Sequence, residues 1–182
     1  MYYQFIDAGK EKIGIVWQYE RERLTLERIY LPRRKDELLA EIRKEFPKIN
    51  KTTRKIPGDI AKQIAKIYAG EKINFDLSLL NLAKLKKFAE RVLLQACKIP
   101  SGKVVTYSGL ACKIGSPLAA RAVGTALANN PFPLIIPCHR IVRSDGSLGG
   151  FGGGIKMKKE LLVKEGIVFN GTGRVSAECF YP

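Results

Sequence analysis

The stretch Leu134-Ile135-Ile136-Pro137-Cys138-His139-Arg140-Ile141-Val142 places the single histidine of the chain directly after one of its four cysteines. Apolar residues on both sides of the pair predict a buried, strand-like setting. The thiolate is the reactive form of cysteine and a neighbouring imidazole favours it, so the pair indicates an activated nucleophile. The alternative is an inert buried cysteine beside a structural histidine, and the pair alone leaves that alternative open.

The charge balance indicates a polyanionic partner. The chain has 182 residues, enough for one or two small domains, and a formal net charge of +15. A surplus of this size is typical of proteins that bind nucleic acid or an anionic membrane surface. Residues 85–182 carry 14 basic and 5 acidic side chains, a net of +9, so the surplus is greatest around the Cys-His pair.

Neither a targeting segment nor a cofactor motif is expected. The first residues lack a signal-peptide pattern and no apolar run is long enough to span a membrane, so we expect a cytoplasmic protein without membrane contact. The four cysteines form no C-x-x-C pair and only one histidine accompanies them, which predicts no metal site and no disulfide framework. No phosphate-binding or dinucleotide-binding glycine motif is present, so no cofactor is expected.

The first half of the chain predicts a small sheet with helices and offers no recognisable chemistry. Residues 3–7, 12–19 and 24–31 are short, partly alternating and contain aromatic and β-branched residues, so they are expected to form an antiparallel sheet. Helices are expected over 35–46 and from Pro57-Gly58-Asp59 to Gly70. Residues 73–77 are expected to add one more strand. A structural role for this half is the favoured interpretation.

The second half begins with a pattern typical of a helix-turn-helix. An amphipathic helix is expected over 82–97. Thr106 can cap a helix that ends at Gly115, and Ser116-Pro117 can start a second helix running from Leu118 to about Ala128. That second helix has many small residues and one charged side chain, Arg121, which suits close approach to a DNA groove. Tight packing of an Ala-rich helix on the core is the alternative.

The last helix is expected over 156–165 and ends on an acidic residue. Glu165 lies in the final turn, where the helix dipole disfavours a negative charge. A residue that breaks a local rule is a candidate functional residue. A solvated helix end, or an ion pair with a nearby lysine, is the alternative interpretation.

Four motifs of the second half occur together: Ala120-Arg121-Ala122-Val123-Gly124, Asn130-Pro131, the segment from Ile136 to Val142, and Glu165-Gly166. In this order they resemble the O6-alkylguanine-DNA alkyltransferases, DNA repair proteins also called methylated-DNA–protein-cysteine methyltransferases. The resemblance covers roughly residues 85–169. It implies a two-domain α/β (α+β) fold, with a ribonuclease-H-like domain over 1–81 and a mostly helical DNA-binding and alkyl-transfer domain over 82–182.

The resemblance also implies an irreversible reaction and a role for each matching residue. Cys138 would accept the alkyl group, His139 would deprotonate it, Glu165 would orient and charge His139, and Asn130 would brace the preceding link. The expected partner of the monomeric protein is double-stranded DNA containing O6-alkylguanine, with O4-alkylthymine as a further candidate substrate. Arg121 would replace the flipped nucleotide and Tyr107 would drive its rotation. Phosphate contacts would come from Ser108, Ser116 and Ser144, and the guanine pocket from Pro133, Ile141, Phe151 and Gly152.

The chain departs from the family pattern at two pocket positions. Phe151 and Gly152 stand where tyrosine and serine are frequent, so a backbone N–H at Gly152 would replace the missing hydroxyl donors. The structural zinc of some members is not expected, because neither cysteine nor histidine occurs before Cys97. Two other classes stay open on the residues alone. A helix-turn-helix regulator leaves the Cys-His pair unexplained, and a Cys-His acyl-transfer hydrolase leaves the DNA-binding features unexplained.

Overall fold

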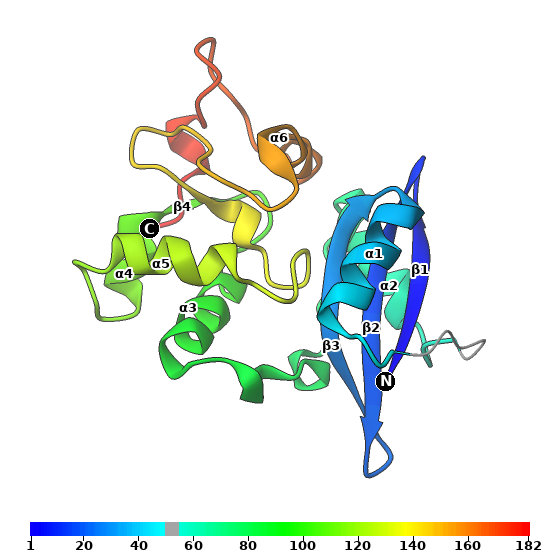
Figure 1. Ribbon diagram of the computed structural model, residues 1–182. Helices are drawn as coiled ribbons and strands as arrows, with labels where there is room; N and C mark the ends of the chain where they lie inside the picture. The colour runs from blue at the N-terminus through cyan, green and yellow to red at the C-terminus, as the bar shows by residue number, and fades with distance from the viewer. Residues whose placement is uncertain (50–54) are drawn as a thin grey trace.

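The computed structural model describes residues 1–49 and 55–182, and its first half is built on an antiparallel sheet (Figure 1). Strands β1 (Tyr2–Ala8), β2 (Glu11–Glu20) and β3 (Arg23–Arg33) follow one another in the order β1-β2-β3. The three predicted strands are therefore confirmed. The alternation of side chains along β2 sends successive residues to opposite faces, so both faces can carry a core.

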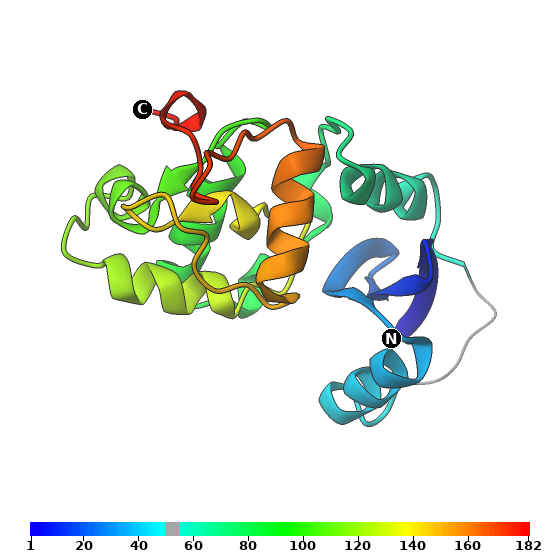
Figure 2. The same cartoon turned by 90° about the horizontal axis from the view of Figure 1, so that it is seen from above.

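Each face of this sheet is covered by a helix (Figure 2). Helix α1 (Lys35–Glu45) packs on the face that carries Val16, and helix α2 (Ile60–Ala69) packs on the face that carries Ile15 and Trp17. Both helices were predicted, and Gly70 ends α2 in the left-handed conformation at φ 94°. The core around Ile15 and Trp17 continues into the second half of the molecule.

The outer strand β3 is paired along its edge with two later segments of the chain. The amide of Asn81 donates to the carbonyl of Leu26 at 2.9 Å, and the amide of Ile29 donates to the carbonyl of Pro131 at 2.9 Å. These bonds satisfy backbone groups that an uncovered edge would leave exposed. They also fix the segment that precedes Cys138 against the sheet.

The carboxylate of Glu27 strengthens the first of these attachments. The side chain of Glu27 is 1% exposed and accepts hydrogen bonds from Gln18 Nε2 at 2.9 Å, Asn81 Nδ2 at 2.8 Å and Lys84 Nζ at 2.5 Å. A buried charge is tolerated when it is paired and hydrogen-bonded in this way. Glu27 therefore fastens the connection between the two halves to the sheet.

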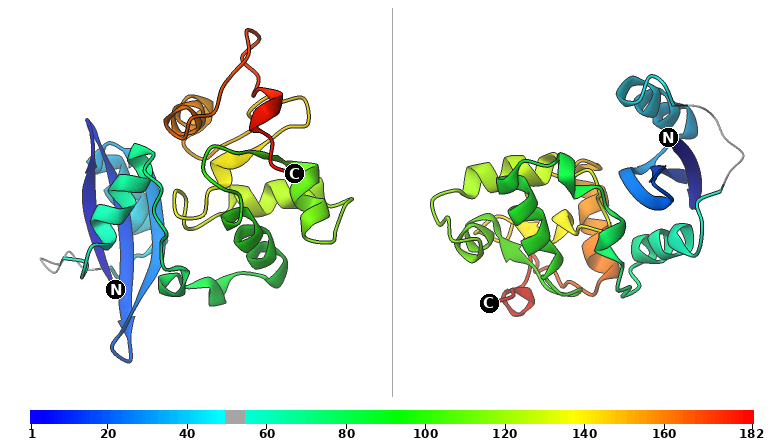
Figure 3. Two further views of the ribbon diagram at one scale, coloured as in Figure 1. Left: turned by 180° about the vertical axis from the view of Figure 1, so that it is seen from behind. Right: turned by 90° about the horizontal axis from the view of Figure 1, so that it is seen from below.

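The second half is mostly helical and lies beside the sheet (Figure 3). Two short strands in it pair in parallel, and helices α4 and α5 pack on each other and on α3. Its regular elements are α3 (Lys87–Cys97), β4 (Val105–Thr106), α4 (Tyr107–Lys113), α5 (Ala120–Ala128), β5 (Ile141–Val142) and α6 (Gly154–Lys164). Short 3₁₀ helices occur at Leu77–Leu79, Leu82–Lys84, Cys138–Arg140 and Ala177–Cys179.

Two predictions for the connection between the halves are wrong. Residues 73–77 form no strand, because Asp76 accepts a hydrogen bond from the amide of Ser78 and starts a 3₁₀ helix. The helix expected from residue 82 begins only at Lys87, since the backbone at Leu85 and Lys86 is extended with ψ near 145° and 141°. The attachment to β3 holds this stretch in a form that a helix could not adopt.

The helix pair of the second half agrees with the sequence except at its second start. Thr106 Oγ1 accepts from the amide of Gly109 at 2.9 Å, so the predicted cap of α4 is confirmed. Ser116 does not cap α5. Its carbonyl accepts from the amide of Ala119 and closes a turn, so the helix begins at Ala120 instead of Leu118. The last helix, α6, lies within one or two residues of its predicted bounds.

Among the described residues, no helix combines the length and the apolar character that crossing a bilayer requires.

The Glu27 attachment gives a stability prediction. Glu27→Ala removes a buried acceptor that binds the part-buried donors of Gln18 and Asn81 and the ammonium of Lys84, so it should lower the free energy of unfolding by ~2–3 kcal/mol. Glu71→Ala is the matched control, because its exposed ion pair with Lys66 should contribute less than about 1 kcal/mol. Urea titration followed by the fluorescence of Trp17 measures both. Equal losses in the two variants would contradict the role of Glu27.

Candidate active site

The Cys-His pair lies on a tight turn and not on the strand-like segment that the sequence predicts. Cys138–Arg140 form a single 3₁₀ turn, and only Ile141–Val142 continue as a strand, paired with β4. The turn is preceded by Leu134, a buried non-glycine residue at φ 77°. Such a conformation is strained for leucine and persists when surrounding contacts determine it. This bend directs Cys138 and His139 into the interior.

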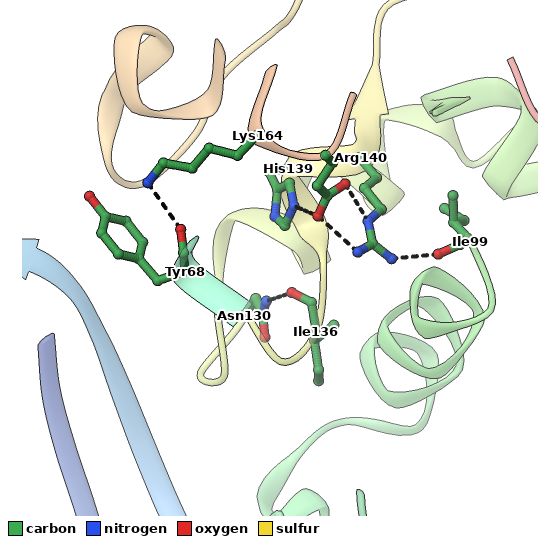
Figure 4. Close-up of polar contacts among 8 residues, drawn as sticks. Tyr68, Ile99, Asn130, Ile136, His139, Arg140 and Lys164 are labelled. Atoms are coloured by element: carbon green, nitrogen blue, oxygen red, sulfur yellow. Dashed lines mark hydrogen bonds and ion pairs between the residues drawn. The ribbon is translucent and has the colours of Figure 1, made fainter. Parts of the chain in front are cut away.

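The side chain of Asn130 supplies those contacts (Figure 4). Its Oδ1 accepts from the amide of Phe132 at 3.0 Å, while its Nδ2 donates to the carbonyl of Ile136 at 3.0 Å and to Cys138 Sγ at 3.3 Å. One buried amide thus ties the segment before Cys138 to the thiol itself. A donor aimed at sulfur also favours the thiolate form.

His139 and Glu165 are brought together as the sequence predicts. The two side chains are almost fully buried, and His139 Nε2 lies 2.9 Å from Glu165 Oε1. A carboxylate accepts hydrogen bonds, so Nε2 carries the proton and Nδ1 keeps its lone pair. Nδ1 is buried and has no hydrogen-bond partner within the described part of the chain. The imidazole can therefore accept a proton at Nδ1.

Arg140 completes this cluster, although no separate role is predicted for it from the sequence. Its Nε and Nη2 donate to the two oxygens of Glu165 at 2.9 Å and 2.8 Å, and its Nη1 donates to the carbonyl of Ile99 at 2.6 Å. Figure 4 shows the guanidinium of Arg140 directed toward Ile99, which follows the end of α3. A two-point contact of this kind fixes the orientation of the carboxylate. The only available signal was the position of Arg140 next to His139.

Burial and these partners set the protonation of the site. Burial lowers the pKa of His139 below its ordinary value of 6.5, so the imidazole is neutral near pH 7. Burial would raise the pKa of Glu165, but hydrogen bonds from His139 and Arg140 outweigh it and lower that pKa. Burial raises the pKa of the Cys138 thiol, against the opposing effects of Asn130 and the charge of Lys158. The resting site is a thiol beside a neutral base.

Cys138 lines two cavities. The larger, about 510 Å³, is also lined by Tyr107, Gly124 and Arg143, and the smaller, about 190 Å³, by Pro133 and residues of β3 that include Arg28 and Leu31. Phe151 and Gly152 line both cavities, and the ring of Phe151 meets that of His139 edge-on at 6.3 Å. Ile141, predicted in the pocket, is fully buried in the core and lines neither cavity.

The residues predicted to contact DNA lie on and around α4 and α5. The ring of Tyr107 packs against Gly124 of α5 and against Gly149, where a Cβ atom would lie only 3.0 Å from the Tyr107 hydroxyl. The hydroxyls of Ser108 and Ser144 lie 3.5 Å apart, although 36 positions separate them in the chain. Arg121 is exposed at the second position of α5, and Ser116 lies in the turn before that helix.

Lys158 is the second residue of the site for which the sequence predicts no role. Its side chain is fully buried on α6, and its Nζ donates to the carbonyl of Ile141 at 2.6 Å. Its spacing from Leu161 and Leu162 places it on the inward face of the helix, a signal that was present in the sequence.

Comparisons with known proteins agree with this geometry. A family model described as "6-O-methylguanine DNA methyltransferase, DNA binding domain" matches residues 87–167. A methylated-DNA–protein-cysteine methyltransferase of Methanothermobacter thermautotrophicus is 45% identical over 102 residues, which cover 56% of this chain and 57% of the relative. One from Methanosarcina barkeri is 38% identical over 130 residues, which cover 71% and 81% of the two chains. The match thus spans little more than half of the first relative and most of the second.

Solved structures extend the likeness to nearly the whole chain. The crystal structure of Mycobacterium tuberculosis OGT in complex with DNA has a TM-score of 0.71 at 30% identity, covering 91% of this chain and 92% of that one. O6-methylguanine-DNA methyltransferase from Pyrococcus kodakaraensis has a TM-score of 0.69 at 25% identity, covering 91% and 99%. The mixed α/β fold is that of these proteins. The resemblance is confirmed, and this chain belongs to the methylated-DNA–protein-cysteine methyltransferase family.

Proposed function

We propose that the protein repairs DNA by direct reversal, moving an alkyl group from guanine O6 to Cys138 Sγ. The observation that carries the proposal is a buried thiol, open to two cavities, beside a neutral imidazole held by a carboxylate. In the reaction the carbon–oxygen bond breaks and a carbon–sulfur bond forms. The thiol proton passes to His139 Nδ1 through a bridging water, and the released guanine takes up a proton in exchange.

The neutral imidazole suits the first step. A soft sulfur nucleophile attacks carbon, and the thiolate is the attacking form. Because burial disfavours a standing thiolate, the base must take the proton as the substrate reacts. Glu165 stabilises the imidazolium that then forms, while Asn130 keeps its donor on the sulfur as negative charge develops.

The larger cavity suits a guanine taken out of the duplex. The O6 atom is shielded in stacked DNA, so the nucleotide must be flipped and the remaining gap filled. Arg121, which is exposed on a helix of mostly small residues, is proposed to enter the base stack. Tyr107 is proposed to crowd the phosphate beside the lesion and to hydrogen-bond the flipped base. Ser108, Ser144 and Ser116 are proposed phosphate contacts. The proximity of the first two hydroxyls supports a shared contact.

The pocket departs from the family pattern in its polar donors. Phe151 and Gly152 offer no hydroxyl, so the backbone amide of Gly152 is the proposed donor to O6. Pro133 lines the smaller of the two cavities that Cys138 shares. Ile141 is fully buried and lines neither cavity, so its proposed contribution to the pocket is limited to packing in the core.

We also propose the division into a ribonuclease-H-like domain over 1–81 and a DNA-binding domain over 82–182. The antiparallel sheet with a helix on each face supports the first, and the family match over 87–167 supports the second. The protein is proposed to act as a monomer, without a cofactor, on double-stranded DNA. Its thiol must stay reduced to react, which favours a cytoplasmic location.

The first test is a titration of a duplex carrying O6-methylguanine against the protein. A thioether on Cys138 is not hydrolysed under mild conditions, so repair should stop at one lesion per molecule, with one methyl added to the Cys138 peptide. Cys138→Ser should abolish transfer yet bind the duplex about as well as the unchanged protein. Continued repair beyond one lesion per molecule, or a mass increase elsewhere, would contradict the proposal.

Arg121→Ala should slow repair of duplex DNA by about tenfold or more, because the extrahelical base loses a stabilisation of the order of its unstacking cost. Reaction with free O6-benzylguanine, which needs no flipping, should change little. Lys98→Ala, an exposed charge removed at the end of α3, is the control. If both substrates slow equally in Arg121→Ala, the residue supports the fold or the pocket instead.

The pH profile tests the base. Protonated His139 cannot accept the thiol proton, so transfer should fall as the pH drops through the pKa of His139. Burial lowers that pKa, so the fall should occur below pH 6.5. Single-turnover rates between pH 5 and 8 measure it, and His139→Gln should lose the feature. A decline already centred above pH 6.5 would show that the imidazole is charged at rest.

A further inference from the structure

Lys158 is a fully buried lysine that the proposed relay of Cys138, His139 and Glu165 does not use. Its ammonium, on α6, donates to the carbonyl of Ile141 at 2.6 Å and to that of Gly150 at 3.4 Å. Lysine is almost never fully buried, because its charge must leave water. Two carbonyl groups compensate only part of this cost. Because the burial of this charge is only partly compensated, a functional role for the ammonium of Lys158 should be sought.

The charged and titratable groups that face Lys158 come from three parts of the chain. On the active-site turn, Cys138 in its thiolate form attracts the ammonium of Lys158. The positive charge of Lys158 in turn disfavours the protonated form of His139. Arg143, just after β5, repels it. From α4, the Tyr107 ring has its centroid 6.0 Å from Nζ, and burial raises the pKa of that phenol, which stays neutral. Of the described groups whose charge acts on Lys158, Cys138 is the one that becomes an anion.

We propose that Lys158 is a positioning residue for alkyl transfer, whose buried ammonium favours the thiolate of Cys138 at the moment the thiol loses its proton. This inference rests on the proposed function for its biological meaning, but the effect on Cys138 exists without DNA. The carbonyl groups of Ile141 and Gly150 hold the ammonium between the strand that follows the Cys-His turn and the loop that lines both cavities.

The effect has a characteristic pH dependence. Burial lowers the pKa of Lys158 to about 8, and the nearby Cys138 opposes that shift. Below this pH the ammonium is charged and can favour the thiolate. Above it the amine is neutral and the help disappears. The advantage of the unchanged protein over a variant without this charge should therefore be large near pH 7 and shrink above pH 9.

The test uses Lys158→Met, which keeps the length of the side chain and removes the charge. Its matched control is Lys156→Met, which removes an exposed charge from the same helix. Iodoacetamide, a small neutral alkylating agent, is added without DNA, and alkylation of the Cys138 peptide is followed by mass spectrometry. An opposite charge nearby shifts a pKa by about one to three units, so the Lys158→Met rate at pH 7 should fall about tenfold or more.

Lys158→Arg, which restores a positive charge, should recover part of the rate. The proposal is overturned if Lys158→Met and Lys156→Met react alike at pH 7. It is equally overturned if Lys158→Met is slower by the same factor at every pH, since a purely structural defect has no reason to disappear as the amine deprotonates. Neither outcome depends on repair, so failure of this inference and failure of the proposed function are distinguishable.

A second measurement covers the case in which Lys158→Met does not fold. Coupling between two titrating groups is reciprocal, so Cys138→Ser should change the titration of Lys158. Without a neighbouring thiolate, the pKa of Lys158 should move down, as followed by NMR of its side-chain amine. An unchanged Lys158 titration in Cys138→Ser contradicts the coupling and overturns the proposal.

Discussion

The carboxylate of Glu165 is the contact on which the rest of the site depends. It accepts from His139 and, at both oxygens, from Arg140, and Arg140 in turn reaches the carbonyl of Ile99 at the end of α3. Three segments far apart in the chain are thereby fixed around one buried charge. The helix dipole disfavours an acid at this place, and the sequence suggested that an imidazolium compensates it. In the structure the permanent cation is Arg140, which leaves the imidazole neutral and available as a base.

Elements governed by local chemistry could be predicted from the sequence, and those governed by distant contacts could not. The cap at Thr106, the glycine that ends α2 at Gly70 and the strand β2 depend on residues a few positions apart, and each is found as predicted. The stretch from residue 73 to residue 86 was wrongly divided into a strand and the start of a helix. Its conformation depends on hydrogen bonds to β3 and Glu27, more than 50 positions earlier, which no window of sequence contains.

The candidate site also combines features that could be predicted from the sequence with features that depend on distant contacts. Cys138, His139 and Glu165 could be named from residue type, position and resemblance, and the last two are in contact. The turn that presents them could not be predicted, because it depends on the amide of Asn130 and on the unusual backbone of Leu134. Lys158 was missed for a different reason. A lysine among the leucines of an amphipathic helix is read as exposed, although its spacing placed it inward.

The first half of the chain was expected to have a structural role, but it also reaches the thiol. Strand β3 provides Arg28 and Leu31 to the cavity of about 190 Å³ that Cys138 shares. The bond from the amide of Ile29 to the carbonyl of Pro131 fixes this strand relative to the segment that Asn130 braces. The edge of the sheet and the active-site turn are therefore held in a fixed position relative to each other. The backbone bond between Ile29 and Pro131 and the side chain of Asn130 both contribute. Because residues of β3 and of the second half line the same cavity as Cys138, the environment of the thiol is built by both halves of the chain.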